Sequence, residues 1–295
     1  EALAGPDAAL WRAAIQEELS SMKELGVFAP LHEHAEPPTD KGVVDTKWVL
    51  RHKKDERGNV VRCKARLVVR GFTQVAGRDF GRTYAPVAEA PSVRMVITLA
   101  ALRGWGIFQL DVRTAYLNAH MDIELYVRST PEMRAAFDAP TADFLRMMRA
   151  VYGAKQSARC WADELADTLK RHGLERSTVD PCIWHGANLL LAIFVDDVII
   201  TFAELEALEA VVHALQREYR ITTEPDASLF VGLQIERRSD VLKLHQRTYL
   251  EELVETTNMM QARPRRTPME AGTQLPKLAR TELTPTQHGQ YRSMV

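Results

Sequence analysis

The segment 189–202, LLLAIFVDDVIITF, constrains the fold of this chain more than any other stretch. Its only polar side chains are those of Asp196, Asp197 and Thr201. Apolar, β-favouring residues on both sides of a two-residue polar break predict two strands joined by a tight turn, with the carboxylates at the tip. Two like charges at a buried sheet edge repel each other unless a cation is bound there. The pair therefore indicates a divalent cation site or, because Asp is a common turn residue, an ordinary hairpin turn.

A third carboxylate in a similar apolar setting favours the cation site. Residues 107–112, IFQLDV, predict a short strand in which Asp111 is the one charged residue. Residues 113–117 then predict a turn into a helical or irregular segment, which places Asp111 at a strand end. The two aspartate positions are compatible with neighbouring strands of one antiparallel sheet.

A basic hairpin precedes these strands. Residues 43–53 and 60–71 flank the turn sequence DERGN and predict two paired strands. Arg62, Lys64 and Arg66 alternate with apolar residues along the second strand, so the three cations share one face. A row of cations suits a triphosphate or a nucleic-acid backbone. It is also typical of a charged edge strand that resists aggregation.

The charges of the chain are distributed unevenly along it. The net charge is −1, but residues 41–70 carry ten Lys/Arg against three Asp/Glu, a local balance of +7. Residues 196–226 carry eight acidic residues against two arginines. This asymmetry indicates that a polyanion is bound at one place and a metal at another.

The remaining pattern alternates helices and strands. Helices are predicted at 8–25, 93–103, 131–148, 157–172, 203–219 and 249–259. A strand at 229–235 is predicted to pair with 241–244. This order predicts an α+β chain with an antiparallel sheet and helices on one face.

Nothing in the sequence predicts export or a membrane span. The chain lacks a run of about eighteen apolar residues and a basic-then-apolar N-terminal segment, so we expect a soluble, non-exported protein without a membrane partner. Cys63, Cys160 and Cys182 are widely spaced and form neither a zinc pattern nor a disulfide framework. This cysteine usage suits a reducing compartment.

The three carboxylates fit Mg²⁺, which takes oxygen ligands and leaves part of its shell to substrate phosphates. Two such ions about 4 Å apart activate a sugar hydroxyl and stabilise the leaving pyrophosphate in an in-line displacement. The carboxylates therefore predict the lengthening of a nucleic-acid strand. A metal-dependent nuclease would use the same ions, but no His or Glu is placed as a partner for an activated water.

Seven segments resemble, in the family's order, the reverse transcriptases of copia-type long-terminal-repeat retrotransposons. They are KWVLRHKKDERGNVVRCKARLVVRGFTQ, TYAPVAEAPSVRMVITLAA, QLDVRTAYLN, VYGAKQSARCW, FVDD, FVGLQI and YRSMV. The resemblance implies a right-hand polymerase fold with an antiparallel palm sheet backed by helices. Its implied parts are an N-terminal helix at 1–26, fingers with the basic hairpin at 27–90, a palm at 91–245 with a helical insertion at about 131–172, and the thumb and start of a connecting region at 246–295.

The resemblance also implies the metal ligands. Asp111 and Asp196 resemble the two main ligands, Val112 would add its backbone carbonyl, and Asp197 would be the third carboxylate. The implied cofactor is a pair of Mg²⁺ ions, with Mn²⁺ as an alternative. The implied reaction is RNA-directed DNA synthesis, in which a dNTP is joined to the 3′-hydroxyl of a DNA primer on an RNA or DNA template.

The nucleotide-binding residues are implied in the same way. Lys64 with Arg66 would neutralise the triphosphate. Tyr116 is similar to the aromatic gate that would clash with a ribose 2′-hydroxyl and so favour dNTP over rNTP. Gln156 falls where the family has a residue beside the incoming nucleotide and the template.

The family further implies RNase H and integrase parts in the same polyprotein, and a cytoplasmic retrotransposon particle, with the nucleus as an alternative location. The chain departs from the family pattern at Ala119, Ala154, Ala158 and TPEMRAAF. None of these positions is a predicted metal ligand, but they alter turns that the family implies lie along the path of the template. The alternative is therefore a degenerate, inactive copy that only binds primer and template.

Overall fold

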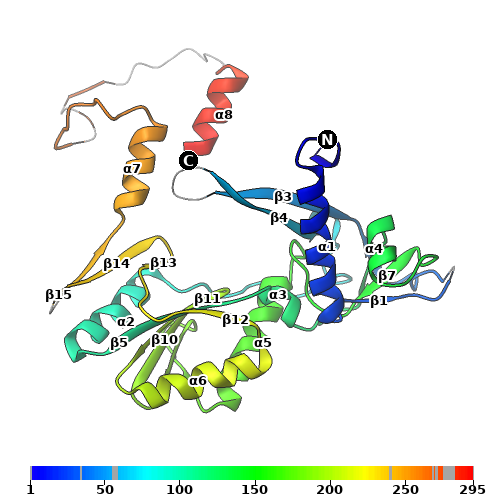
Figure 1. The fold of residues 1–295 in the computed structure, drawn as a ribbon, viewed down its shortest axis with the longest axis horizontal. Helices are drawn as coiled ribbons and strands as arrows, with labels where there is room; N and C mark the ends of the chain where they lie inside the picture. Colours follow the sequence, from blue (N-terminus) through cyan, green and yellow to red (C-terminus); the bar gives the residue numbers. More distant parts are fainter. Residues whose placement is uncertain are drawn as a thin grey trace. The chain divides into compact units, whose positions relative to one another are not determined.

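The chain forms two compact units, residues 1–246 and 247–295, in a computed structural model. The structure describes residues 2–33, 35–54, 59–238, 241–267, 269, 272–274 and 283–294. In the described part of the first unit, the strands form four sheets (Figure 1). The observed architecture is α+β, as the order of the elements predicts.

The largest sheet carries the carboxylates. Its strand order is β12-β5-β11-β10-β9-β8, and every pair in it is antiparallel. The strands are β5 (Gly106–Val112), β8 (Glu175–Arg176), β9 (Ile183–Gly186), β10 (Leu189–Phe194), β11 (Asp197–Phe202) and β12 (Ile221–Glu224). Because β5 and β11 are direct neighbours, the expected pairing of the two aspartate-bearing strands is confirmed.

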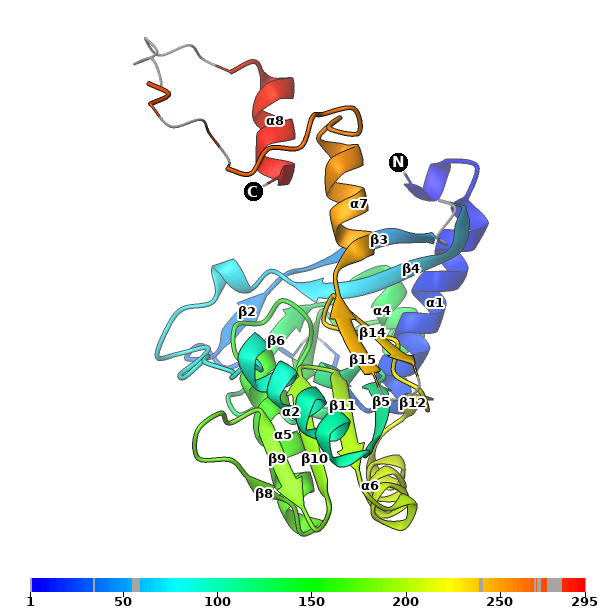
Figure 2. The same cartoon turned by 90° about the vertical axis from the view of Figure 1, so that its left-hand side faces the viewer.

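Both faces of this sheet are covered (Figure 2). On one face lie α5 (Ser157–Arg171) and α6 (Leu205–Glu218). On the other lie α2 (Ala90–Arg103) and a small sheet of β13 (Leu229–Phe230), β14 (Leu233–Arg238) and β15 (Val241–His245). The expectation of helices on one face only is wrong. Ile199 and Ile200 point to opposite faces of β11 and are both fully buried, so both faces require a cover.

The basic hairpin packs on the N-terminal helix. It consists of β3 (Thr46–Lys54) and β4 (Val60–Val69), and α1 (Ala8–Glu24) runs beside it (Figure 1). Cys63, Ala65 and Leu67 of β4 are buried in one cluster with the apolar face of α1. The cations between them point to the opposite face, as the alternation predicts. Residues 55–58 of the predicted turn lie outside the described residues.

A mixed four-stranded sheet completes this region. Its order is β1-β7-β6-β2, and only the β2–β6 pair is parallel. The strands are β1 (Phe28–Pro30), β2 (Gly42–Val44), β6 (Leu125–Arg128) and β7 (Phe144–Met147). Strands from the segment predicted as palm thus pair with strands from the segment predicted as fingers.

Two predicted elements differ from the structure. Residues 131–148 are not one helix, because only α4 (Pro131–Ala136) is helical and β7 pairs on both sides with β1 and β6. Strand pairing overrides the helix propensity of this Met- and Ala-rich segment. Residues 229–235 are not one strand, because the chain turns at Val231 and Gly232, which have φ of +47° and +74°, and so separates β13 from β14.

Short helical segments connect the strands, and two further helices lie in the second unit. The former are η2 (Gly71–Thr73) and α3 (Ala115–Asn118), and the latter are α7 (Arg247–Thr256) and α8 (Pro285–Met294). One more short segment, η1 (Ala2–Ala4), precedes α1. The thumb assignment of this unit remains a prediction. Among the helices of the described residues, none has the length and apolar character needed to cross a bilayer.

Candidate active site

The turn that carries the aspartate pair lies one residue earlier than predicted. Phe194 is paired with Asp197, so the two turn residues are Val195 and Asp196, and Asp197 is the first residue of β11. Val195 has φ of +60°, a left-handed conformation that is unfavourable for a β-branched side chain. Surrounding contacts must therefore stabilise this turn.

The sheet register brings the third carboxylate to the turn. Asp111 of β5 lies directly opposite Asp197 of β11. Directly opposed side chains point to the same face, with Cβ atoms about 4.5–5.5 Å apart. The Val112 amide donates a hydrogen bond to the Asp196 carbonyl oxygen at 2.8 Å, which fixes the turn against β5. The structure thus gathers Asp111, Asp196 and Asp197 at one end of two central strands.

The electrostatics of this cluster favour a bound cation. Burial raises the pKa of Asp111, and the negative charge of Asp196 raises it further. Burial also raises the pKa of Asp197, to which Asp196 and Asp111 both add. Lys64 and Lys53 act in the opposite direction on Asp111. The dominant effects disfavour the charged carboxylates, so a cation at this place would relieve both the repulsion and the desolvation.

The donor set suits Mg²⁺ rather than a metal held entirely by side chains. Within the part of the chain that the structure describes, no three His, Cys, Asp or Glu side chains are arranged to enclose a metal ion. Mg²⁺ is commonly held by one or two carboxylates, with water and substrate phosphates completing its shell. The open cluster of half-buried carboxylates fits that mode of binding. The predicted contribution of the Val112 carbonyl stays a prediction.

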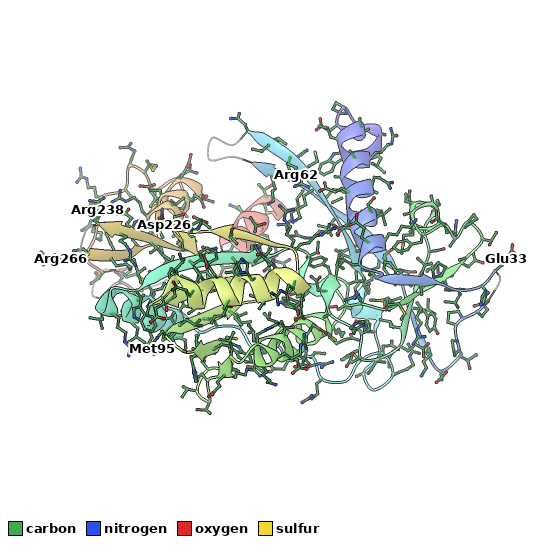
Figure 3. All side chains as sticks on the ribbon, turned by 60° about the horizontal axis from the view of Figure 1, so that its bottom comes forward. Glu33, Arg62, Met95, Asp226, Arg238 and Arg266 are labelled. Carbon is green, nitrogen blue, oxygen red and sulfur yellow. The ribbon has the colours of Figure 1, made fainter. Side chains whose placement is uncertain are left out.

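The cationic face of β4 lies within electrostatic reach of these acids. Lys64 and Arg66 are half-buried. Burial and the neighbouring charges of Arg66 and Lys53 lower the pKa of Lys64. Arg62, further out on the projecting hairpin (Figure 3), forms an ion pair with Glu17 of α1. Of the three cations on this face, Lys64 is the one whose charge acts on Asp111, and the predicted contact of Lys64 and Arg66 with a triphosphate stays a prediction.

A buried acid that sequence reasoning missed lies beneath these cations. Glu18 of α1 is 9% exposed, and burial raises the pKa of its carboxyl group, whereas Lys64 and Arg66 oppose that rise. In the described structure its Oε1 atom lacks a hydrogen-bond partner. Glu18 lies between Ile15 and Leu19 on the apolar face of a helix predicted only to pack, and that position was the available signal.

Tyr116 has an aromatic neighbour that the sequence did not reveal. The ring of Tyr152 lies 5.0 Å from the ring of Tyr116, centroid to centroid. The guanidinium carbon of Arg66 lies over the Tyr152 ring, 5.3 Å from its centroid. Burial raises the pKa of Tyr152 to about 12, so its hydroxyl is neutral at physiological pH. Tyr152 therefore links the predicted sugar gate to a predicted triphosphate-binding cation.

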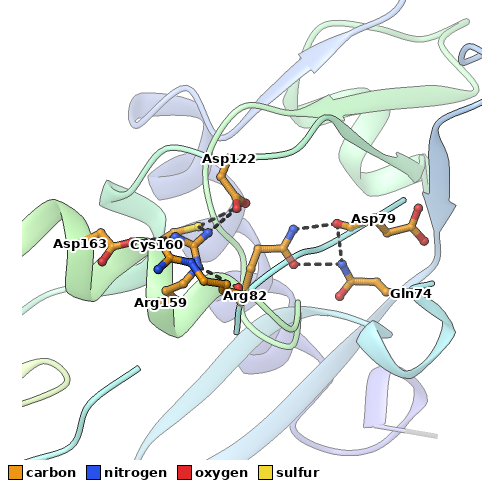
Figure 4. A network of polar contacts seen from close by, with 8 residues as sticks. Gln74, Asp79, Arg82, Asp122, Arg159, Cys160 and Asp163 are labelled. Atoms are coloured by element: carbon orange, nitrogen blue, oxygen red, sulfur yellow. Dashed lines mark hydrogen bonds and ion pairs between the residues drawn. The ribbon is translucent and has the colours of Figure 1, made fainter. Parts of the chain in front are cut away.

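Gln156 lies in a different polar network, together with Gln74 and Asp79, which Figure 4 labels. Its side chain is fully buried, accepts a hydrogen bond from Gln74 at 3.0 Å and donates one to the carbonyl oxygen of Asp79 at 2.9 Å. A separate set of contacts nearby centres on Arg159, which donates to the carbonyl oxygen of Arg82 at 2.8 Å. In this arrangement Gln156 ties the 74–79 loop to the start of α5. Its predicted contact with the nucleotide stays a prediction.

Comparison with known proteins identifies the family to which this chain belongs. Residues 31–271 match the family "Reverse transcriptase (RNA-dependent DNA polymerase)". The chain therefore belongs to the reverse transcriptase family.

Its relatives are Pol polyproteins of copia-type retrotransposons. The chain is 32% identical to the retrovirus-related Pol polyprotein from transposon RE2 of Arabidopsis thaliana over 88% of its own length and 18% of that protein. It is 30% identical to the one from transposon TNT 1-94 of Nicotiana tabacum over 94% of its length and 21% of that protein. The chain thus spans about a fifth of these relatives. A solved structure of a foamy viral protease-reverse transcriptase in complex with double-stranded DNA aligns with 86% of this chain and with 37% of the viral chain. The sequence identity is 13% and the TM-score is 0.41, which is too low to show a shared fold.

Proposed function

We propose that this chain is an RNA-directed DNA polymerase that transfers a nucleotidyl group from a dNTP to the 3′-hydroxyl of a DNA primer on an RNA or DNA template. Membership of the reverse transcriptase family supports this proposal. The observation that carries it is the register that sets Asp111 opposite Asp197 and beside the turn residue Asp196. Like-charged, half-buried carboxylates destabilise a fold, so their presence together at the ends of two central strands has a functional explanation.

Asp111 and Asp196 are the proposed main ligands of two divalent cations, with Asp197 as the weaker third. When bound, a pair of Mg²⁺ ions would supply activation of the primer hydroxyl and neutralisation of the charge on the leaving pyrophosphate. The protein's own part is to hold the carboxylates on rigid strands, so that little reorganisation accompanies the reaction.

Lys64 and Arg66 are proposed to bind the triphosphate from the hairpin above the carboxylates. Their positive charges would draw the anionic nucleotide towards the site and orient it. Tyr116 is proposed to lie beside the deoxyribose and to exclude a 2′-hydroxyl by steric contact. A Tyr116→Ala variant should raise the rNTP to dNTP ratio of kcat/KM at least about tenfold. An unchanged ratio would remove the gate role.

Primer extension tests the proposal directly. The purified chain is incubated with a DNA primer on an RNA template, dNTPs and Mg²⁺, beside an active reverse transcriptase as positive control. Extension is expected for the wild type and should be abolished in Asp196→Asn. If the positive control extends the primer and the wild-type chain does not, polymerase activity is refuted for this chain.

The second candidate is a chain that binds primer and template without extending it. The departures at Ala154 and Ala158, both beside the start of α5, favour keeping this alternative. Binding measured by fluorescence anisotropy separates the two functions. Binding that Asp111→Asn leaves unchanged, together with no extension by the wild type, would establish the binding-only function.

A further inference from the structure

A hydrogen bond from the buried Trp161 side chain supports the turn that carries Asp196. In a two-residue hairpin turn, the carbonyl of the first turn residue has no partner in the strand ladder. Here that carbonyl belongs to Val195, and it accepts a hydrogen bond from the indole Nε1 of Trp161 at 2.7 Å. Trp161 is 1% exposed. A protein group rather than bulk water therefore satisfies the carbonyl of the residue that holds the unfavourable φ of +60°.

The indole is itself held in place from α5 and α6. The ring of Tyr219, which follows α6, contacts the indole edge to face at 5.2 Å and 77°. The hydroxyl of Tyr219 lies 2.6 Å from the hydroxyl of Thr168, two turns further along α5 from Trp161. Tyr219, held by Thr168, thus restrains the side of the indole that it contacts.

Packing alone does not fix the indole on its other side. A cavity of about 290 Å³ adjoins it and is also lined by Tyr116, Val195 and Trp184. Because open space borders the ring, its orientation toward the turn depends on the hydrogen bond to the Val195 carbonyl.

We propose that Trp161 is a positioning residue, which holds the Val195–Asp196 turn in the conformation that sets the Asp196 carboxylate for nucleotidyl transfer. It acts through the turn and not on the substrate. The proposal rests on the proposed polymerase function for its consequence, but not for its structural content. Loss of the N–H would remove the donor to the half-buried carbonyl of Val195, the residue that holds the unfavourable φ, and the turn would move in response.

The test compares Trp161→Phe, which keeps an aromatic ring and removes the donor, with Trp184→Phe as the matched control. Trp184 lies on β9, is 2% exposed and lines the same cavity. The readout is hydrogen exchange of the Val112 amide, which donates to the Asp196 carbonyl oxygen. Exchange at Val112 should become at least about tenfold faster in Trp161→Phe and stay unchanged in Trp184→Phe.

Primer extension provides the functional readout. In Trp161→Phe, kcat should fall at least about tenfold, whereas KM for dNTP should stay within about twofold, because Lys64, Arg66 and Tyr116 are untouched. Replacing Trp161 by the isosteric benzothienylalanine removes only the N–H and serves if the phenylalanine variant does not fold. It should reproduce the faster exchange.

Unchanged Val112 exchange in either donor-free variant would overturn the proposal, as would an equal rise in Trp184→Phe. If the wild type does not extend a primer, the proposed function fails by itself, and the exchange experiment still decides the role of Trp161.

Discussion

Asp197→Asn should stabilise the protein in the absence of metal while it impairs catalysis. In the native state, Asp197 faces Asp111 across the strands and adjoins Asp196. Burial, then Asp196 and then Asp111 raise the pKa of its carboxyl group above the ordinary value of 3.8, so the charged form is disfavoured in the fold. An amide has nearly the same shape and carries no charge. Removing the charge therefore relieves repulsion without creating a cavity.

The register allows the size of this gain to be worked out. Opposed carboxylates about 5 Å apart repel by about 0.8 kcal/mol at a dielectric constant of about 80 and by about 3 kcal/mol at about 20. Asp111 and Asp197 are only half-buried, so solvent screening places the net gain near the lower end, at about 1 kcal/mol. For a chain of this size, about 1 kcal/mol corresponds to a rise in Tm of about 2–4 °C.

The gain must depend on pH in a defined direction. Because the pKa of Asp197 is higher in the folded state, the destabilising charge is fully present above the folded pKa and disappears as pH falls toward 3.8, the ordinary value. The difference in unfolding free energy between Asp197→Asn and wild type is measured in urea by tryptophan fluorescence at about pH 7 and at successively lower pH. The stabilisation should be largest near neutral pH and shrink in acid.

Asp163→Asn is a suitable control. The Asp163 carboxylate accepts from Arg159 Nη1 at 2.6 Å, so its removal should not stabilise the protein. The reasoning is refuted if Asp197→Asn gives no gain at neutral pH, if the gain grows in acid, or if Asp163→Asn stabilises equally.

Millimolar Mg²⁺ should raise the Tm of the wild type, and EDTA should reverse that rise. The rise should be smaller in Asp197→Asn. An equal rise in both proteins would show that Asp197 does not bind the metal. Gly153→Ala should lower the free energy of unfolding by about 1–3 kcal/mol more than Gly173→Ala does. Both glycines have positive φ, but of the two only Gly153 has a backbone oxygen 2.3 Å from the position of an added Cβ. Equal urea midpoints of the two variants would contradict this. Tyr152→Ala removes the ring that contacts Tyr116 and should raise rNTP incorporation. Tyr152→Phe keeps the ring and should leave rNTP incorporation unchanged. Equal rNTP incorporation by the two variants would show that Tyr152 does not support Tyr116.

The parts of the site that the sequence predicts are encoded locally. The apolar runs around Asp196 predict β10 and β11, and the single charge in IFQLDV marks Asp111. The alternation along β4 predicts which residues face away from the core. In each case the pattern lies within one element, and the rule that connects it to the structure is the two-residue period of a strand.

The parts that the sequence does not predict depend on partners distant in the chain. β7 is a strand only because β1 and β6 lie on either side of it, more than fifteen residues away in sequence. Tyr152 belongs to the site because Arg66 and Tyr116 approach it from two other elements. The cover on the second face of the sheet could have been predicted from the sequence. Consecutive apolar residues such as Ile199 and Ile200 point to opposite faces of a strand, so neither face is expected to be exposed to solvent.

The turn comprises Val195 and Asp196, one residue earlier than predicted, and this shift makes the two adjacent aspartates structurally different. With Val195 and Asp196 in the turn, Asp197 is a strand residue whose side chain shares a face with Asp111. Asp196 is instead held through its backbone, by the Val112 amide at 2.8 Å and by the Trp161 bond to the preceding carbonyl. The orientation of Asp197 is thus set by the sheet, whereas that of Asp196 depends on the turn and its support. Perturbing Trp161 should therefore affect the function of Asp196 more than that of Asp197, which a turn centred on Asp196 and Asp197 together would not predict.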